Sequence, residues 1–205
     1  MTLPVKFTED VRELPTHAFG HRSLTWWGVV AFFLIEGTAF GLAIGTYFFL
    51  QGVEDNWPPD PWQPPGLIWG TLFTILIVLS EIPNTIVKRA AEKHDVATIR
   101  RFMLVLLPIF ALLLLFRALE FTTLNVMWTD NAYGSIIWAL LVLHLTHILT
   151  DIVDSVVLTA LMFTIHSGEN RRVVDVAENA MYWRFVWLTW LPIYLLIYWV
   201  PRWVA

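Results

Sequence analysis

Two histidines and two aspartates stand in the stretch LHLTHILTDIVD, Leu143 to Asp154, which is otherwise apolar. At 100° per residue, His144, His147, Asp151 and Asp154 point within an arc of about 80° on one face of a helix. Ionisable groups inside a membrane are costly, so this stripe is expected to face protein or water rather than lipid. These four residues are the first candidates for chemistry.

Three interpretations of the stripe are open, and each involves Glu36, which lies at the centre of another apolar segment. The favoured one is a structural network of neutral carboxylic acids or acid–imidazole pairs. A second is conduction or buffering of protons by Glu36, His147 and Asp151. A third is a metal site formed by His144, His147, Asp151 and Glu36. The Glu-x-x-His motifs of di-iron bundles are absent from the sequence, which disfavours the third.

Several kinds of redox and covalent chemistry have no candidate residues. Of the six histidines only His144 and His147 fall within an apolar segment, and they share one helix, which disfavours haem held by two histidines. Lys6, Lys88 and Lys93 lie away from mid-membrane positions, so a retinal Schiff base is excluded. The chain has no cysteine and no phosphate-loop, Ser-His-Asp or zinc-protease motif. We therefore predict no metal, cofactor or catalytic residue, and a protein that is not an enzyme by itself.

The elements that position these residues are predicted to be membrane helices. The 205 residues are 57% hydrophobic and 15% charged, with a mean hydropathy of +0.62. Five apolar segments reach the roughly 20 residues that a helix needs to cross a bilayer; they are 24–50, 66–87, 99–121, 135–164 and 181–201. The predicted fold is all-α: a cytoplasmic segment 1–23, then one polytopic bundle of five transmembrane helices, 24–205.

The basic residues predict the orientation of this bundle. Ten of the thirteen basic residues lie before the first span, or in and next to the second and fourth connections: Lys6, Arg12, Arg22, Lys88, Arg89, Lys93, Arg100, Arg101, Arg171 and Arg172. The first connection has no Lys or Arg. The positive-inside rule therefore places the amino terminus in the cytoplasm and the carboxyl terminus outside.

Other polar residues lie inside or near the predicted spans. Arg117 and Glu120, at i and i+3, are expected to pair with each other or with a lipid headgroup. The polar group within Ser80–Asn84, which includes Glu81, is interpreted as a snorkelling helix end, a helix contact or a proton-entry region. Arg184 is expected to meet a lipid phosphate or to neutralise a buried carboxylate.

Small, cyclic and aromatic residues give further expectations about packing. Pro108 and Pro192 are expected to kink their helices. Gly37, Gly41 and Gly45 form a small-residue stripe that is expected to pack against a helix of this chain or of a partner. Eight tryptophans fall near span ends, where indoles favour the membrane interface: Trp26, Trp57, Trp62, Trp69, Trp128, Trp183, Trp199 and Trp203.

The order and spacing of five motifs resemble subunit III of the haem-copper oxidases, the cytochrome c and quinol oxidases. WWGVVAFFLIEGTAFGLAIGTYFFL resembles the family helix whose acid follows an apolar stretch, here Glu36. PWQPPG and TLFTILIVLSEIPNT resemble the Pro-rich outer loop and the next helix. ALEFTTLNVMWTDNAYGSIIWALLVLHLTH resembles the His-x-x-His helix with the segment before it, and ENAMYWRFVWLTWLPIYLLIYW resembles the closing helix.

The chain also departs from the family pattern. Arg184 and Trp187 stand where the family has His and Asp, and Glu81 stands where a small hydroxyl residue is common. Asp151 and Asp154 are not usual after His-x-x-His. These differences indicate a divergent branch of the short, five-helix bacterial form.

The resemblance implies a non-catalytic subunit of a respiratory terminal oxidase in the bacterial cytoplasmic (inner) membrane. Such a subunit packs on the catalytic subunit I beside subunit II, binds phospholipid and supports proton uptake during oxygen reduction in aerobic electron transport. Haem and copper belong to the partner subunits, and no nucleic acid is expected as a partner. The residues expected to give polar, lipid or proton support are Glu36, Glu81, Glu120, His144, His147, Asp151, Asp154 and Arg184. The alternatives are a similar component of nitric oxide reductase, or a stand-alone membrane metalloenzyme or ion carrier.

Overall fold

The regular structure of the described residues is entirely helical. The computed structural model describes residues 15 and 17–204, so most of the predicted segment 1–23, with Lys6 and Arg12, lies outside the described residues. The elements in chain order are η2 (Gly20–Arg22), α1 (Leu24–Val53), α2 (Leu67–Glu92), α3 (Val96–Phe121), α4 (Ala132–Met162), α5 (Asn170–Tyr194), η3 (Leu195–Trp199) and α6 (Val200–Val204).

All five predicted spans are confirmed as helices long and apolar enough to cross a membrane, the last running from Asn170 to Val204. This last helix begins at residue 170, whereas the predicted span begins at 181. The prediction is late because the first turns are polar, and hydropathy does not detect polar helical turns. Their apolar side is nevertheless buried in the bundle, at Val173, Val176 and Ala177. Burial of one face is sufficient to stabilise a helix whose other face is charged.

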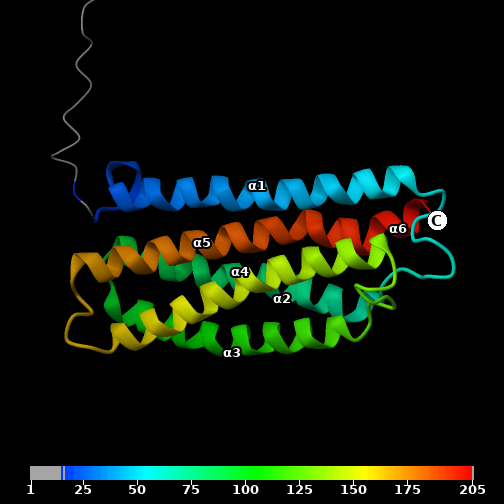
Figure 1. Ribbon diagram of the computed structural model, residues 1–205. Helices are drawn as coiled ribbons and strands as arrows, with labels where there is room; N and C mark the ends of the chain where they lie inside the picture. The colour runs from blue at the N-terminus through cyan, green and yellow to red at the C-terminus, as the bar shows by residue number, and fades with distance from the viewer. Residues whose placement is uncertain (1–14, 16, 205) are drawn as a thin grey trace, which may run out of the picture.

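The helix α1 lies at the side of the bundle. Figure 1 shows α2, α3, α4 and α5 packed together, with α1 running along one edge; its neighbours are α4 and α5. Phe40 and Tyr47 are the buried side chains of α1. A Cβ atom added to Gly37 would lie 3.9 Å from Phe185, whereas one added to Gly41 or Gly45 would meet nothing within 4 Å. The glycine stripe is therefore largely uncovered by this chain, and its packing against a partner stays a prediction.

The prolines do not interrupt the helices. The helices α2 and α3 continue through Pro83 and Pro108. After Pro192 the helix changes to a π-helical turn, Leu195–Trp199. This local change near a missing N–H is one of the recognised ways in which a helix accommodates proline.

Two tryptophans assigned to the membrane interface lie instead in the protein interior. Trp57 is 3% exposed and donates to Tyr47 Oη at 2.8 Å, and Trp183 is 1% exposed and donates to Ser80 Oγ at 2.8 Å. A buried indole needs an acceptor for its N–H, and both residues have one. The interface prediction is wrong for these two because proximity to a span end does not specify which face of a helix is covered.

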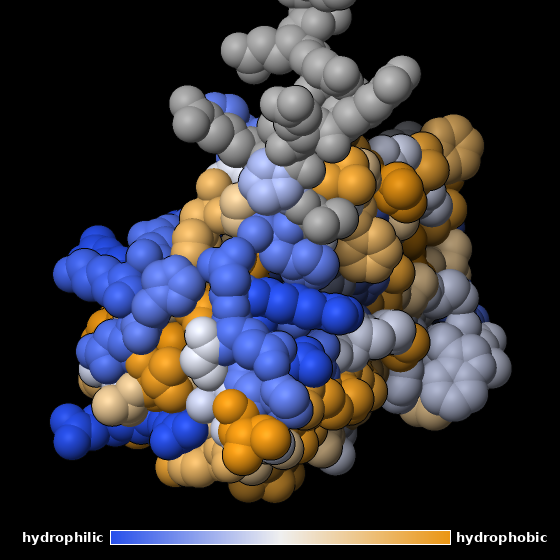
Figure 2. Space-filling view, turned by 90° about the vertical axis from the view of Figure 1, so that its left-hand side faces the viewer, coloured by the Kyte–Doolittle hydropathy of each residue, from blue (hydrophilic) through white to orange (hydrophobic). Residues whose placement is uncertain are grey.

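The connections that carry the predicted cytoplasmic charges all meet at one end of the bundle, which we call the basic end. The helices α1, α3 and α5 begin there, and α2 and α4 end there (Figure 1). Figure 2 looks onto this end and shows hydrophilic side chains gathered across it. The connections whose basic residues predict one side of the membrane therefore lie at one end of the helix bundle. Which side that end faces stays a prediction.

Candidate functional site

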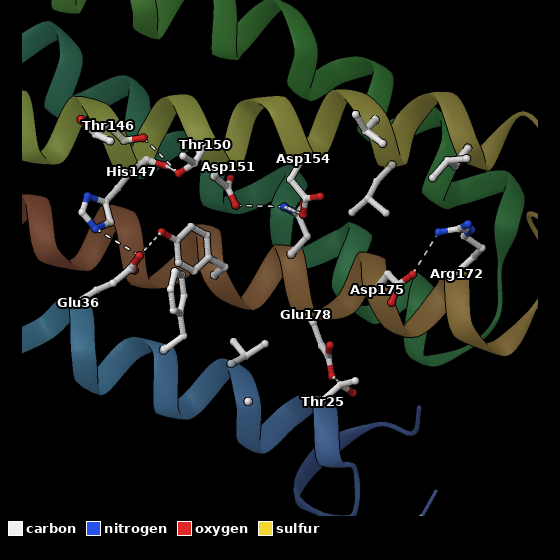
Figure 3. A pocket seen from close by; sticks show the side chains of 18 residues that line it. Thr25, Glu36, Thr146, His147, Thr150, Asp151, Asp154, Arg172, Asp175 and Glu178 are labelled. Atoms are coloured by element: carbon white, nitrogen blue, oxygen red, sulfur yellow. Dashed lines mark hydrogen bonds and ion pairs between the residues drawn. The ribbon is translucent and has the colours of Figure 1, made fainter. Parts of the chain in front are cut away.

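A large cavity lies between α1, α4 and α5 toward the basic end. Its volume is about 860 Å³, and we call it the cleft. The helix α1 lines it with Thr25, Gly28, Phe32 and Glu36, which recur every three or four residues and so share one helix face. The stripe on α4 lines the opposite side with His147, Asp151 and Asp154 (Figure 3).

Glu36 is held at the inner part of the cleft by two partners. Tyr182 donates from its hydroxyl to Glu36 Oε1 at 3.1 Å, and His147 Nε2 lies 3.4 Å from the same oxygen. His147 Nδ1 lies 2.6 Å from the carbonyl oxygen of Leu143 and must donate to it. In a neutral ring Nε2 is then an acceptor, and it faces the carboxylate oxygen of Glu36, which is also an acceptor. The contact is therefore attractive only when a proton is bound to Nε2 or to the carboxyl group. This arrangement can hold one proton at mid-helix depth.

Asn179 joins the two aspartates of α4 to α5. Its Nδ2 donates to Asp151 Oδ1 at 3.0 Å and to Asp154 Oδ2 at 3.2 Å, and its Oδ1 accepts from Ser155 Oγ at 2.9 Å. Asp151 is 1% exposed, and its Oδ2 has no hydrogen-bond partner. A buried acceptor in this state is costly, so this oxygen is available to a ligand or to water.

Further charged groups line the cleft near the basic end. Glu178 accepts from Thr25 Oγ1 at 2.7 Å, and Arg172 Nη1 lies 3.4 Å from Asp175 Oδ2. Sequence reasoning missed these residues as parts of the site because it placed 170–180 outside the last span. The recurring apolar positions that include Val173 could have revealed the longer helix.

His144 does not belong to the cleft, although it shares a helix face with the three residues that do. Its Nδ1 lies 3.0 Å from Arg117 Nη2, and its Nε2 lies 3.0 Å from the carbonyl oxygen of Val186. Because that oxygen can only accept, Nε2 carries the proton and Nδ1 accepts from the guanidinium. The stripe is thus divided between two environments.

His144 belongs to a group of four buried side chains that we call the sealed cluster: Arg117, Glu120, His144 and Tyr198. Each of them is at most 1% exposed. Arg117 donates to Glu120 Oε2 at 2.6 Å, and Tyr198 donates to Glu120 Oε1 at 2.5 Å. Arg117 and Glu120 pair with each other, as predicted, and their burial removes the headgroup alternative.

Aromatic rings and a close helix contact seal this cluster. The Arg117 guanidinium lies 3.8 Å from the ring centre of Phe73 and 4.2 Å from that of Trp190, which is cation–π geometry. Its Nε has no hydrogen-bond partner beneath these rings. A Cβ added to Gly70 would come within 2.3 Å of Tyr198 Cζ. Glycine at this position therefore allows Tyr198 to reach Glu120.

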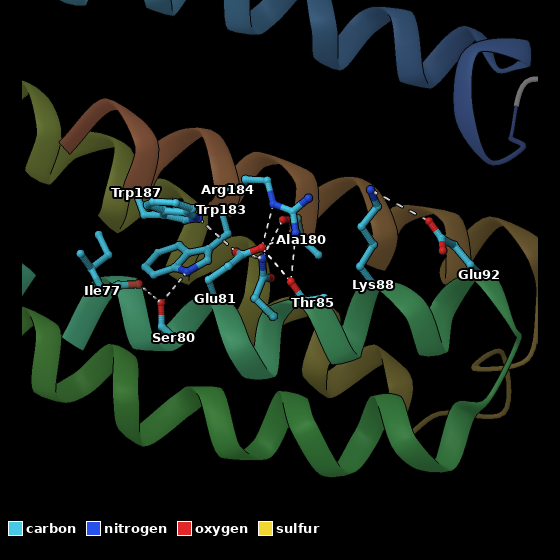
Figure 4. Close-up of polar contacts among 11 residues, drawn as sticks. Ile77, Ser80, Glu81, Thr85, Lys88, Glu92, Ala180, Trp183, Arg184 and Trp187 are labelled. Carbon is cyan, nitrogen blue, oxygen red and sulfur yellow. Dashed lines mark hydrogen bonds and ion pairs between the residues drawn. The ribbon is translucent and has the colours of Figure 1, made fainter. Parts of the chain in front are cut away.

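A third polar group connects α2 and α5 on another side of the bundle (Figure 4). Arg184 donates from Nε to Glu81 Oε1 at 2.7 Å, and Trp187 Nε1 donates to Glu81 Oε2 at 3.1 Å. Asn84 donates to a main-chain carbonyl of α5 at 2.9 Å. The structure thus confirms two of the interpretations: Arg184 neutralises a largely buried carboxylate, and the polar group of α2 makes a helix contact.

Metal ligation finds no geometric basis in the part of the chain that the structure describes. There, no three His, Asp or Glu side chains come together in a group that could hold a metal ion. His147 and Glu36 approach each other, while His144 faces Arg117 instead. The ligand set proposed from the sequence is therefore not assembled.

Five long apolar helices, three of which line a polar cleft, define this chain as a multi-pass membrane protein. Its sequence matches the family of cytochrome c oxidase subunit III over residues 16–203, and the chain belongs to that family. It is 23% identical over 188 residues to cytochrome c oxidase subunit 3 of Thermostichus vulcanus, which covers 91% of this chain and 92% of that protein. Subunit III is one component of a multi-subunit oxidase.

Proposed function

We propose that this protein is a non-catalytic, five-helix subunit of a respiratory haem-copper terminal oxidase in a bacterial cytoplasmic membrane. It packs on the catalytic subunit I, with subunit II in the same complex, and the haem and copper are carried by those partners. The observation that carries the proposal is the family match, which extends over residues 16–203 rather than over a single motif.

Its proposed contribution is to bind phospholipid in the cleft and to support proton uptake during oxygen reduction. The cleft joins apolar walls, such as Phe32, to charged groups near the basic end, as a lipid site requires. Polar groups continue from that end to Glu36, which shares its environment with His147 and Tyr182. Groups arranged in this way can receive protons from the surface and hold them near the partner subunit.

Affinity purification of the tagged chain from its native membrane tests the assignment. We expect a co-purifying subunit with a haem absorption spectrum and cyanide-sensitive oxygen consumption. A complex that contains haem but consumes nitric oxide instead of oxygen would show that the chain is a component of a nitric oxide reductase. A preparation without haem and without either activity would refute the proposal.

A further inference from the structure

A stripe of polar side chains runs along α2 on the outside of the helix bundle, where Arg184 of α5 meets it. We propose that a transmembrane helix of the haem-bearing partner subunit packs on this face and places a neutral hydrogen-bond acceptor, a hydroxyl or amide oxygen, against Arg184. This inference rests on the proposed function, because that function supplies the partner. It adds which face of the chain meets the partner and what the partner presents there.

The stripe starts at the basic end and reaches the middle of the span. At 100° per residue its four members point within an arc of about 60°; they are Glu81, Thr85, Lys88 and Glu92. Figure 4 shows them in a row along α2, with Arg184 reaching them from α5. Glu81 lies 14 residues after Leu67 and 11 residues before Glu92, the two ends of α2. The pair of Glu81 and Arg184 is therefore too near the middle of the helix to be a snorkelling helix end.

The described helices leave this ion pair partly uncovered. The side chain of Arg184 is 39% exposed and that of Glu81 is 17% exposed. Leu188, one turn after Arg184 on the same face of α5, is 47% exposed. The polar stripe of α4, by contrast, faces the cleft, where α1 lies opposite it. Because ionised groups that face hydrocarbon at this depth are costly, the stripe of α2 requires cover by another protein.

The hydrogen bonds of the pair show what the covering protein must present. Glu81 accepts five of them, from Thr85 Oγ1, Asn84 Nδ2, Trp187 Nε1 and both Nε and Nη2 of Arg184. A carboxylate offers about four lone-pair sites, so Glu81 has no capacity for a further donor. Arg184 Nη1, in contrast, makes no hydrogen bond within the part of the chain that the structure describes. The unused group is therefore a donor, and it requires an acceptor.

The balance of charge decides between a neutral and an ionised acceptor. Glu81 already neutralises Arg184, and Lys88 Nζ lies 4.0 Å from Glu92 Oε1. A carboxylate from the partner would leave a net negative charge in a medium that screens charge poorly, whereas a hydroxyl or amide oxygen keeps the contact neutral. A second copy of this chain, packed about a two-fold axis, would bring one guanidinium against another and supply no acceptor. The acceptor is therefore expected on a different subunit.

The outer face of α3 provides a control surface. Residues 102–116 are all apolar. Leu104, Leu112 and Leu115 are 49%, 39% and 53% exposed, respectively. Apolar side chains can face acyl chains because they have no hydrogen bonds to satisfy. We therefore expect this face to contact lipid in the assembled complex.

Photo-crosslinking in the assembled complex tests the position of the partner. Leu188 or Leu115 of the tagged, full-length chain is replaced by p-benzoylphenylalanine, and native membranes that contain the complex are irradiated. We expect position 188 to give a product that joins the chain to the haem-bearing subunit, and position 115 to give several times less of it. Equal yields, a higher yield from position 115, or a product of two copies of this chain at position 188 would overturn the inference. Haem absorbance and oxygen consumption of the same complex report separately on the proposed function.

A double variant tests the acceptor. Arg184→Met with Glu81→Gln removes the donor without leaving an unpaired charge. The haem-bearing subunit retained on the tagged chain after a detergent wash should then fall about tenfold, as for the loss of a charge-assisted hydrogen bond. Arg101→Met, which removes an exposed arginine at the basic end, should leave retention unchanged. Unchanged retention by a folded double variant would overturn the need for an acceptor; if the double variant does not fold, the product from position 188 in the otherwise unchanged chain decides.

Discussion

His144 and His147 lie one turn apart on α4, but their side chains have different surroundings. His144 belongs to the sealed cluster, where both ring nitrogens have partners and no atom is accessible. His147 faces the cleft beside Glu36. One helix therefore carries two kinds of polar site: the sealed cluster, whose polar groups bind one another, and the cleft, where Glu36 and Asp151 each keep an oxygen without a hydrogen-bond partner.

The difference lies in how completely each region satisfies its own polar atoms. The sealed cluster leaves only Arg117 Nε unpaired among its four described side chains, and aromatic rings cover that group. The cleft leaves Glu36 Oε2, Asp151 Oδ2 and Arg172 Nε without partners. A region whose charges pair with one another contributes to structure, whereas a region with unpaired donors and acceptors has polar atoms that other molecules can bind.

Removing the acid of the sealed cluster should give the largest effect. Glu120→Ala leaves the buried Arg117 without its counter-charge, and we expect the free energy of unfolding to fall by about 3–5 kcal/mol. Chemical denaturation of the purified subunit in detergent measures this loss. Glu54→Ala, at an exposed carboxylate, is the control. Equal stability of the two variants would contradict the importance of the buried pair.

A methyl group at the helix contact should have the next largest effect. Gly70→Ala would press on Tyr198 at 2.3 Å and displace it from Glu120, at a cost of about 1–3 kcal/mol. Thermal unfolding reports the change. Gly41→Ala should leave the isolated subunit unaffected, because nothing lies within 4 Å of its added Cβ. If the two variants unfold at the same temperature, the close contact is not a constraint.

Changing the cleft should affect turnover more than folding. Glu36→Ala is expected to slow oxygen consumption less than about tenfold, below the hundredfold or more typical of a lost essential proton-transfer group. The purified, correctly assembled complex should be followed through repeated turnovers, with the unfolding midpoint of the subunit as the control. Complete loss of oxygen consumption would show that Glu36 is essential rather than supportive.

The smallest effect is expected from the hydroxyl that orients Glu36. Tyr182→Phe removes one hydrogen bond and should cost about 0.5–1.5 kcal/mol of stability. A double-mutant cycle with Glu36→Ala isolates this contact, because the tyrosine change should have no effect once the acid is absent. A penalty of equal size in both backgrounds would assign the effect to ring packing.

Much of the helix arrangement could be predicted from the sequence, and its limits are visible at particular residues. The five spans follow from hydropathy because the bilayer imposes a length of about 20 apolar residues on each. The polar start of α5 was missed, and with it Asp175 and Glu178 as parts of the cleft. Helical periodicity placed His144 with His147, although the two meet different neighbours.

The sequence by itself determined that this chain is a membrane protein of five helices with ionisable groups on their inner faces, because solvent and local periodicity act on short segments. Only the tertiary structure decided which of those groups meet. Arg117 reaches His144 across 27 positions of the chain, and Asp151 reaches Asn179 across 28. Such contacts depend on the rotation and spacing of whole helices, and side-chain packing between helices sets these.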